Sequence, residues 1–222
     1  MRGPAEGVCL KMTVKTFANN EMGQNTYLYY DEAAGDAVII DAGCSAADRD
    51  EIARIIKDRN LRVHAILLTH GHFDHILAVP EIRQITPARV CCHESEAPLL
   101  ENPALNFSAF FGTALSVAPE RLLRGGEALD FGGVALKALH TPGHTPGGVC
   151  FYDDANGRVF TGDTLFRESI GRTDLPMGNM QDLLGSVEKT LLTLPDRVAV
   201  YPGHGLATDI GHERRHNPFT KR

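Results

Sequence analysis

The sequence predicts a mixed α and β fold, and three observations carry this prediction. Short apolar segments rich in β-branched and aromatic residues recur along the chain, as is typical of buried strands. Between them lie stretches whose apolar residues have the spacing of one helical face, such as Ile52, Ile55 and Ile56. Several apolar segments are followed directly by loops that contain histidine or aspartate beside glycine, so rigid elements are expected to carry functional side chains on loops.

The first half of the chain is predicted to form a β-meander followed by a β-α-β step. Strands are expected at residues 12–17, 26–30 and 37–40, where β-branched and aromatic residues surround a connection containing asparagine and glycine. Residues 48–57 place isoleucines on one face with charges between them, which predicts a helix. The apolar run 63–68 predicts the strand that completes the step.

The second half is predicted to contain short strands and helices. Helical spacing marks three stretches, of which the first two contain proline interruptions: 76–85, 94–111 and 180–194. Short apolar segments predict four strands: 136–139, 148–152, 159–160 and 198–200. The aromatic piece 106–111 is suited to a pocket wall, an interface or the core, and core packing is the favoured interpretation.

Length and composition favour one domain that spans residues 1–222. The chain has 43% hydrophobic residues, enough for a substantial core, and no linker-like or low-complexity stretch interrupts it. Candidate ligand motifs run from residue 70 to residue 204, so the site needs both halves of the chain. The formal net charge of −6 disfavours nucleic acid as a partner, because such binding relies on many lysine and arginine contacts to phosphates.

The cell compartment expected from the sequence is the cytoplasm. Residues 1–7 lack a basic start followed by an apolar stretch, and no segment approaches about 18 consecutive apolar residues, so neither secretion nor membrane insertion is expected. The cysteines are odd in number and form no C-x-x-C pair, which indicates reduced thiols that act as small buried hydrophobes. They are Cys9, Cys44, Cys91, Cys92 and Cys150.

The densest chemical signal is the motif 69–75, Thr-His-Gly-His-Phe-Asp-His, directly after a predicted strand. It places four potential metal ligands within six residues: His70, His72, Asp74 and His75. Buried without a metal, three imidazoles and a carboxylate would repel or desolvate one another, whereas divalent ions make them mutually supportive. The alternative, a polar loop that happens to hold histidines, does not account for this density.

Three further ligand candidates follow apolar segments downstream: His144, Asp163 and His204. For the two histidines the alternative is a loop residue that hydrogen-bonds backbone, and for Asp163 it is an Asx-turn, which would be favoured if that motif stood alone. The other motifs reverse that preference. The five remaining histidines lack a comparable setting and are expected to be structural or exposed: His64, His93, His140, His212 and His216.

With these signatures in order, the chain resembles the metallo-β-lactamase superfamily over almost its whole length. The resemblance implies a four-layer αββα sandwich, and it assigns the seven candidates to two metals. The first metal would take His70, His72 and His144; the second would take Asp74, His75 and His204; Asp163 would bridge them. Two divalent ions per chain are therefore expected, zinc first, with iron and manganese as alternatives because mixed nitrogen and oxygen ligands suit all three.

The two-metal set implies hydrolysis of a carbonyl compound by water activated between the ions. Asp74 is the predicted catalytic residue, because it would bind metal while orienting that water or taking its proton. A class B β-lactamase is disfavoured, because one or more of these ligand positions typically differs there.

Three segments resemble the short, single-domain glyoxalase II-like hydrolases of bacteria: 160–166, 171–176 and 211–219. That branch hydrolyses S-lactoylglutathione and similar thioesters, so a small-molecule thioester is the expected substrate. Only 18 residues follow His204, so the helical domain with which longer enzymes bind glutathione is expected to be missing. Candidate arginines for the glutathione carboxylates are Arg167, Arg172, Arg214 and Arg215. Alternatively, Arg172 forms a structural ion pair with Asp174.

Other functions stay open at this point. The first alternative is a persulfide dioxygenase of the same superfamily, with one iron held by His70, His144 and Asp163. A nuclease is disfavoured by the acidic charge, and a non-enzymatic metal-binding protein is disfavoured because all seven candidate ligands are present. A lactonase of this superfamily would differ from a thioesterase mainly in the side chains that line the substrate pocket, so it also remains an alternative. The oligomeric state is not predicted.

Overall fold

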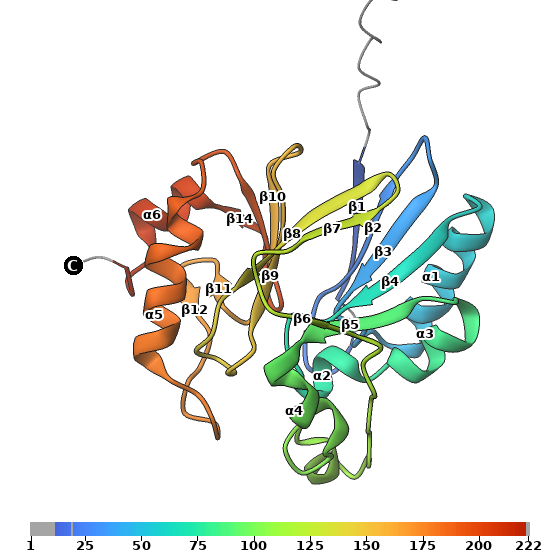
Figure 1. The fold of residues 1–222 in the computed structure, drawn as a ribbon, viewed down its shortest axis with the longest axis horizontal. Helices are drawn as coiled ribbons and strands as arrows, with labels where there is room; N and C mark the ends of the chain where they lie inside the picture. Colours follow the sequence, from blue (N-terminus) through green and yellow to red (C-terminus); the bar gives the residue numbers. More distant parts are fainter. Residues whose placement is uncertain (1–11, 19, 221–222) are drawn as a thin grey trace, which may run out of the picture.

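The computed structural model describes residues 12–18 and 20–220. Within them, two six-stranded sheets face each other, and helices cover the outer face of each sheet (Figure 1). The four-layer arrangement of α and β elements expected from the sequence is thereby confirmed. Cys9 lies outside the described residues.

The first sheet has the strand order β1-β2-β3-β4-β5-β6. Its strands are β1 (Met12–Phe17), β2 (Thr26–Asp31), β3 (Asp36–Ile40), β4 (Arg62–Leu67), β5 (Arg89–His93) and β6 (Arg121–Leu123). The meander β1-β2-β3 is antiparallel, whereas β3, β4, β5 and β6 run parallel. Because parallel strands end at the same edge of a sheet, the loops after β3 and β4 lie side by side.

The second sheet has the order β14-β13-β10-β9-β8-β7. Its strands are β7 (Ala128–Phe131), β8 (Val134–His140), β9 (Val149–Asp153), β10 (Arg158–Gly162), β13 (Ala199–Pro202) and β14 (Thr208–Asp209). A small ribbon pairs β11 (Leu165–Phe166) with β12 (Ser169–Ile170). The parallel pair β10 and β13 brings the loops that carry Asp163 and His204 together.

Six α-helices and three 3₁₀ turns are present in the described part of the chain. The helices are α1 (Ala46–Asp58), α2 (Phe73–Ile76), α3 (Val79–Ile85), α4 (Ala97–Glu101), α5 (Met180–Lys189) and α6 (Ile210–His216). The 3₁₀ turns are η1 (Glu94–Glu96), η2 (Ser108–Phe111) and η3 (Leu191–Thr193). Helices α1 and α3 lie outside the first sheet, and α5 and α6 lie outside the second (Figure 1). None of these helices is long and apolar enough to span a membrane.

Side-chain alternation along the strands explains the layers. On β3, Val38 and Ile40 point into the core between the two sheets, whereas Ile39 points into the core beneath α1 and α3. On β9, Phe151 belongs to the core between the sheets, and Cys150 packs on the other side with α5. The central strands β2, β3 and β9 are therefore buried on both faces, which accounts for their nearly continuous apolar sequences, whereas β7 and β8 alternate buried and exposed residues.

Residues 94–111, predicted to be helical with proline interruptions, form the turn η1, helix α4 and the turn η2, with a non-helical segment between α4 and η2. Helix α4 ends at Glu101, because Asn102 precedes Pro103 and adopts an extended backbone, and the residue before a proline is disfavoured in a helix. The helix predicted at 76–85 is divided between α2 and α3, and that at 180–194 ends at Lys189 before a 3₁₀ turn. Strands β5, β6, β7 and β14 and helix α6 were not predicted.

The described cysteines are free thiols in buried positions, as the sequence indicated: Cys44, Cys91, Cys92 and Cys150. Burial raises the pKa of each thiol, to about 11 for Cys91 and about 12 for the other three. These cysteines are therefore protonated, apolar core residues rather than nucleophiles.

Candidate metal centre

The motif 69–75 leaves the end of β4 as a loop and then forms α2, and Asp41 fixes its shape. The Asp41 carboxylate accepts hydrogen bonds from the Thr69 backbone N–H at 2.7 Å and the Thr69 hydroxyl at 2.6 Å. Its Oδ2 also lies 2.9 Å from Nδ1 of His75. Asp41 therefore ties the start of the motif to its end. Sequence analysis missed this residue, although an aspartate directly after a predicted strand was a usable signal.

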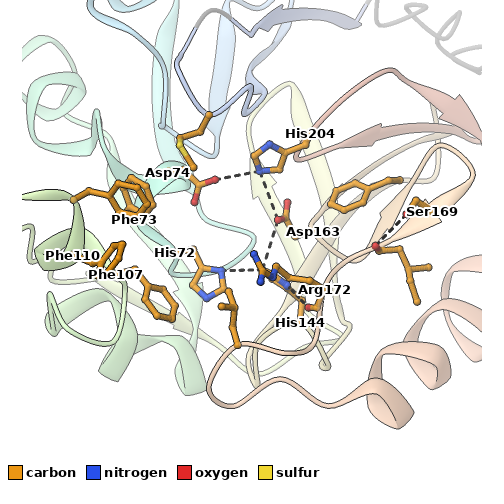
Figure 2. Close-up of a pocket in the computed structure, with 15 residues that line it drawn as sticks. His72, Phe73, Asp74, Phe107, Phe110, His144, Asp163, Ser169, Arg172 and His204 are labelled. Atoms are coloured by element: carbon orange, nitrogen blue, oxygen red, sulfur yellow. Dashed lines mark hydrogen bonds and ion pairs between the residues drawn. The ribbon is translucent and has the colours of Figure 1, made fainter.

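The structure brings all seven predicted ligands together at the loop edge of the two sheets, and Figure 2 shows five of them around one cavity. Ligand atoms lie within 4.8 Å of one another in three groups: His70, His72 and His144; His70, His75 and Asp163; Asp74, His75 and His204. Asp163 lies between the first and the last group. One of its oxygens is 3.3 Å from Nε2 of His75, and the other is 3.6 Å from Nε2 of His144 and 3.7 Å from Nε2 of His204.

Outer contacts orient the rings of His70 and His144 so that Nε2 of each faces the centre, where Nε2 of His144 lies 2.9 Å from Nδ1 of His72. Nδ1 of His70 lies 3.1 Å from the Thr69 hydroxyl, and Nδ1 of His144 lies 2.8 Å from the backbone oxygen of Arg172. Such outer contacts orient metal-binding imidazoles. Nε2 of His70 is buried without a hydrogen-bond partner, and Nε2 of His75 and Oδ1 of Asp163, although 3.3 Å apart, do not meet hydrogen-bond geometry and are also unpaired. Because an unpaired buried polar atom costs about 1–3 kcal/mol, these atoms fit a site whose partners are metal ions.

The surroundings shift the pKa values of three of these histidines in opposite directions. Burial and the neighbouring imidazoles lower the pKa of His70 well below its ordinary value and that of His72 to about 3. Burial also opposes charge on His75, but Asp163, Asp74 and Asp41 outweigh it and raise its pKa. Divalent ions would replace these opposing protonation states with one arrangement of neutral imidazoles and ionised carboxylates.

Glu96, in the turn η1, joins the ligand loops of the two sheets. Its side chain is fully buried. Oε2 accepts from the N–H of Gly71 at 2.7 Å, and Oε1 accepts from the N–H of Gly147 at 2.8 Å. Gly71 lies between His70 and His72, and Gly147 belongs to the loop of His144. Burial raises the pKa of Glu96. The sequence offered no signal for this role, because the residue fell within a predicted helix.

A second clamp holds the loop of His204. The side-chain amide of Asn25 donates to the backbone oxygens of Pro202 at 3.0 Å and Gly205 at 2.9 Å, and its backbone N–H donates to Gly203. A side chain at Gly203 would have its Cβ 2.2 Å from a carboxylate oxygen of Asp163. Asn25, directly before strand β2 of the first sheet, thus fixes the loop of the second sheet that carries His204.

A cavity of about 700 Å³ opens in front of the cluster. Its polar lining includes His72, Asp74, His144, Asp163, Ser169, Arg172 and His204, and its apolar lining includes Met22, Phe73, Phe107, Phe110, Phe111, Phe166, Ile170 and Leu175. The favoured prediction of core packing for residues 106–111 was therefore wrong for the three phenylalanines. Only Asn106 and Ser108 of that piece are fully buried.

Of the four candidate arginines, only Arg172 lines the cavity. It forms a two-pronged ion pair with Asp174, at 2.7 and 2.8 Å, which is the alternative considered from the sequence. Arg214 binds Asp196 and the backbone oxygen of Leu194, and Arg215 lies 3.4 Å from Asp196. These two arginines and the exposed Arg167 lie outside the cavity lining, so their positions do not support a role in binding substrate.

The five other histidines stay out of the cluster, as expected. His93 and His140 stack with ring centroids 4.1 Å apart, and His64 lies 2.6 Å from Asp36. His212 contacts Glu168 and the ring of His216.

Comparison with known sequences extends these findings. A sequence model described as the Metallo-beta-lactamase superfamily matches residues 19–204. A protein named Hydroxyacylglutathione hydrolase GloC, from Haemophilus influenzae, is 34% identical over 211 residues, which cover 94% of this chain and 98% of that protein. A protein named Probable metallo-hydrolase YqgX, from Bacillus subtilis, is 42% identical over 171 residues, covering 76% of this chain and 81% of the other.

Solved structures show the same similarity. BLEG-1 B3 metallo-beta-lactamase superposes with a TM-score of 0.87 at 39% identity, covering 95% of this chain and 100% of the other. TTHA1623 in a di-iron-bound form gives a TM-score of 0.80 at 38% identity, with coverage of 93% and 100%. ETHE1 from Myxococcus xanthus gives 0.77 at 32% identity, with coverage of 93% and 83%.

Proposed function

The chain belongs to the metallo-β-lactamase superfamily, whose members are metal-dependent hydrolases, and from this premise we propose that it hydrolyses small-molecule thioesters at a two-metal centre. The observation that carries the proposal is the complete set of seven ligand side chains, three of which, His70, His75 and Asp163, have a buried and unpaired inward atom. Loss of a single ligand would have argued for a different chemistry or for none.

The proposed ligand sets are those expected from the sequence. His70, His72 and His144 would hold one ion and Asp74, His75 and His204 the other, with Asp163 shared. When bound, two divalent ions lower the pKa of a shared water and polarise a carbonyl group. Zinc is the first candidate. The similarity to a structure described as di-iron-bound supports a pair of ions and keeps iron, beside manganese, as an alternative.

Asp74 is the proposed catalytic carboxylate. It lies on the cavity wall, with Oδ2 3.2 Å from Nε2 of His204 (Figure 2). The same oxygen lies 3.8 Å from Nε2 of His75. Nearby imidazoles outweigh the effect of burial and lower its pKa, so it is ionised at neutral pH. An ionised carboxylate at this position can orient the attacking water and accept its proton.

The proposed substrate class rests on the relative named Hydroxyacylglutathione hydrolase, which makes S-lactoylglutathione the first thioester to assay. Arg172 is the remaining candidate for a substrate carboxylate. Such a role would require it to exchange its partner Asp174 for the substrate. We expect Arg172→Ala to raise KM more than it lowers kcat if this exchange occurs.

Metal analysis of the purified protein tests the proposal. Without chelators, two ions per chain are expected in the wild type and in His140→Ala, which removes a histidine outside the cluster. His75→Ala and His204→Ala are expected to lose one ion each. Thiol release from S-lactoylglutathione should follow the two-metal state and should exceed hydrolysis of a β-lactam, which the similarity to BLEG-1 makes the competing substrate.

A different metal count would overturn the proposal. One iron per chain, retained in both His75→Ala and His204→Ala, would leave His70, His144 and Asp163 as its ligands. That result would replace the hydrolase with a mononuclear-iron dioxygenase. Two ions per chain together with faster β-lactam hydrolysis would retain the centre but refute the thioester.

A further inference from the structure

Aromatic side chains form one wall of the cavity beside the metal ligands. This aromatic wall consists of Phe73, Phe107, Phe110 and Phe111. Phe73 and Phe111 are stacked with ring centroids 4.2 Å apart, and Phe107 lies 5.4 Å from the ring of His72. In Figure 2 the labelled members lie on the side of His72 and Asp74, away from Ser169.

Two members of the aromatic wall are unusually open to solvent. Phe110 is 85% exposed and Phe111 is 52% exposed, and their rings meet edge to face at 5.5 Å. Exposed apolar surface forfeits roughly 25 cal/mol per Å² of burial energy. A group of exposed aromatic rings at the mouth of a cavity therefore indicates a surface that is covered when ligand binds.

Buried polar contacts hold this exposed surface in place. The side chain of Asn106 accepts from the N–H of Ser108 at 2.9 Å and donates to the backbone oxygen of Leu115 at 2.9 Å. Its backbone oxygen accepts from the N–H of Phe73, at the first residue of α2, the helix that also carries Asp74 and His75. The aromatic wall is thus fixed directly to the helix that bears metal ligands.

The backbone of Phe107 is a further indication. Its φ is +68°, in the left-handed region, which costs a residue with a Cβ roughly 1–2 kcal/mol. Such strain persists where the surroundings impose it, and it is concentrated at functional sites. Here the buried neighbours Asn106 and Ser108 impose it, and the result is a phenyl ring beside a metal ligand.

The charge of the cavity lining also favours an apolar ligand group. Among the lining residues, Arg172 is the one arginine or lysine, and Asp174 already pairs with it. A strongly anionic substrate therefore finds little free positive charge away from the metals, whereas an apolar group finds a preformed surface of aromatic rings.

We propose that the preferred substrate is a thioester whose acyl group is bulky and apolar, bound by the aromatic wall. This inference rests on the proposed thioester hydrolysis. Water adds to the acyl carbon, the carbon–sulfur bond breaks, and the sulfur leaves with the bonding electrons as a thiol. The products are a carboxylate, a thiol and one proton. In this proposal the acyl carbon lies at the metal centre, with the acyl substituent directed towards His72 and Phe107 and the sulfur directed away from them.

Thioesters of one thiol, N-acetylcysteamine, isolate the acyl group. With metal-loaded protein, phenylacetyl thioester is expected to exceed acetyl thioester in kcat/KM by about tenfold or more, after correction for uncatalysed rates, because an aryl group gains roughly 1.5–3 kcal/mol on burial. Phe110→Ala should lower the phenylacetyl value about fivefold and the acetyl value much less, so that the ratio of the two falls. Phe219→Ala, at a phenylalanine that is 46% exposed and lies outside the cavity lining, is the matched control.

Product binding provides a readout independent of turnover. By calorimetry, phenylacetate is expected to bind more tightly than acetate to the wild type and to Phe219→Ala, and Phe110→Ala should reduce that difference. Equal kcat/KM across the acyl series would overturn the inference and leave thioester hydrolysis standing. If no thioester is hydrolysed, the proposed function fails, and calorimetry alone decides whether the aromatic wall binds apolar acids: a preference retained in Phe110→Ala would refute it.

Discussion

Replacing Glu96 with alanine should destabilise the protein severely, although Glu96 is not a proposed metal ligand. The substitution leaves the N–H groups of Gly71 and Gly147 without their acceptors, at 2.7 and 2.8 Å, in a fully buried site. Each unpaired buried donor costs about 1–3 kcal/mol, so we expect a loss of about 2–6 kcal/mol. Relief of the buried charge offsets part of this loss, because burial raises the pKa of Glu96. Against a typical total stability of about 5–15 kcal/mol, the effect is large.

Urea unfolding of chelator-treated protein at pH 7, followed by circular dichroism, measures this loss without a contribution from metal. Glu94→Ala is the matched control in the same turn. Its side chain is 48% exposed and pairs with the exposed Arg124, so its removal should cost less than about 1 kcal/mol. Glu96→Gln should lie between wild type and Glu96→Ala, because an amide offers one acceptor oxygen for two donors.

The reasoning would be refuted by an unfolding free energy of Glu96→Ala within about 0.5 kcal/mol of that of Glu94→Ala, a difference typical of ordinary surface substitutions. Metal titration adds a second criterion. Because Glu96 holds the loops of His70, His72 and His144, Glu96→Gln should weaken metal binding even where the variant remains folded.

Two further predictions concern the rest of the fold. Burial opposes ionisation of Asp36, but hydrogen bonds from His64, a backbone N–H and an arginine outweigh it and lower its pKa. Its stabilisation, on the order of 1 kcal/mol, is therefore present above about pH 4 and lost as the pH falls through the lowered value, so the difference in thermal unfolding between wild type and Asp36→Asn should shrink as the pH falls below about 4. Gly162→Ala places a Cβ 2.2 Å from the Thr69 hydroxyl at a φ of +48°, whereas Gly157→Ala, at +61°, meets no atom within 4 Å. Unfolding should show the first variant about 1–3 kcal/mol less stable than the second, and equal stability would contradict the steric argument.

The clustering of the seven candidate ligands was predictable from the sequence because local patterns reveal these residues. The motif 69–75 joins a strand to a helix within a few residues, and each later ligand follows a strand with glycine or proline beside it. A residue directly after a strand is held at the edge of its sheet, so strands that end at one edge predict ligands that meet there. The four-layer arrangement itself came from the family resemblance, because alternation alone does not show how sheets pair.

What the sequence did not reveal depends on contacts between distant residues. Asp41 binds Thr69 and His75, 28 and 34 positions away, and Glu96 binds Gly147, 51 positions away. The position of Asp41 directly after a predicted strand was a local signal, but no local pattern identifies the distant partners of Asp41 or of Glu96. The prediction of core packing for residues 106–111 was wrong for a related reason. Apolar composition favours burial, and the sequence does not show that the buried contacts of Asn106 and Ser108 hold the phenylalanine rings at the surface.

The division of the ligands between the two sheets makes metal occupancy a reporter of interlayer packing. Residues 70–75 extend from the first sheet, whereas His144, Asp163 and His204 extend from the second, so neither half holds a complete set. Phe151 and Phe160 pack between the sheets and are fully buried, and a smaller residue at either position would let the layers shift. Such a shift would separate the two partial ligand sets. A chelator competition assay would therefore detect disturbed packing in the centre of the molecule, even though the altered residue touches no metal.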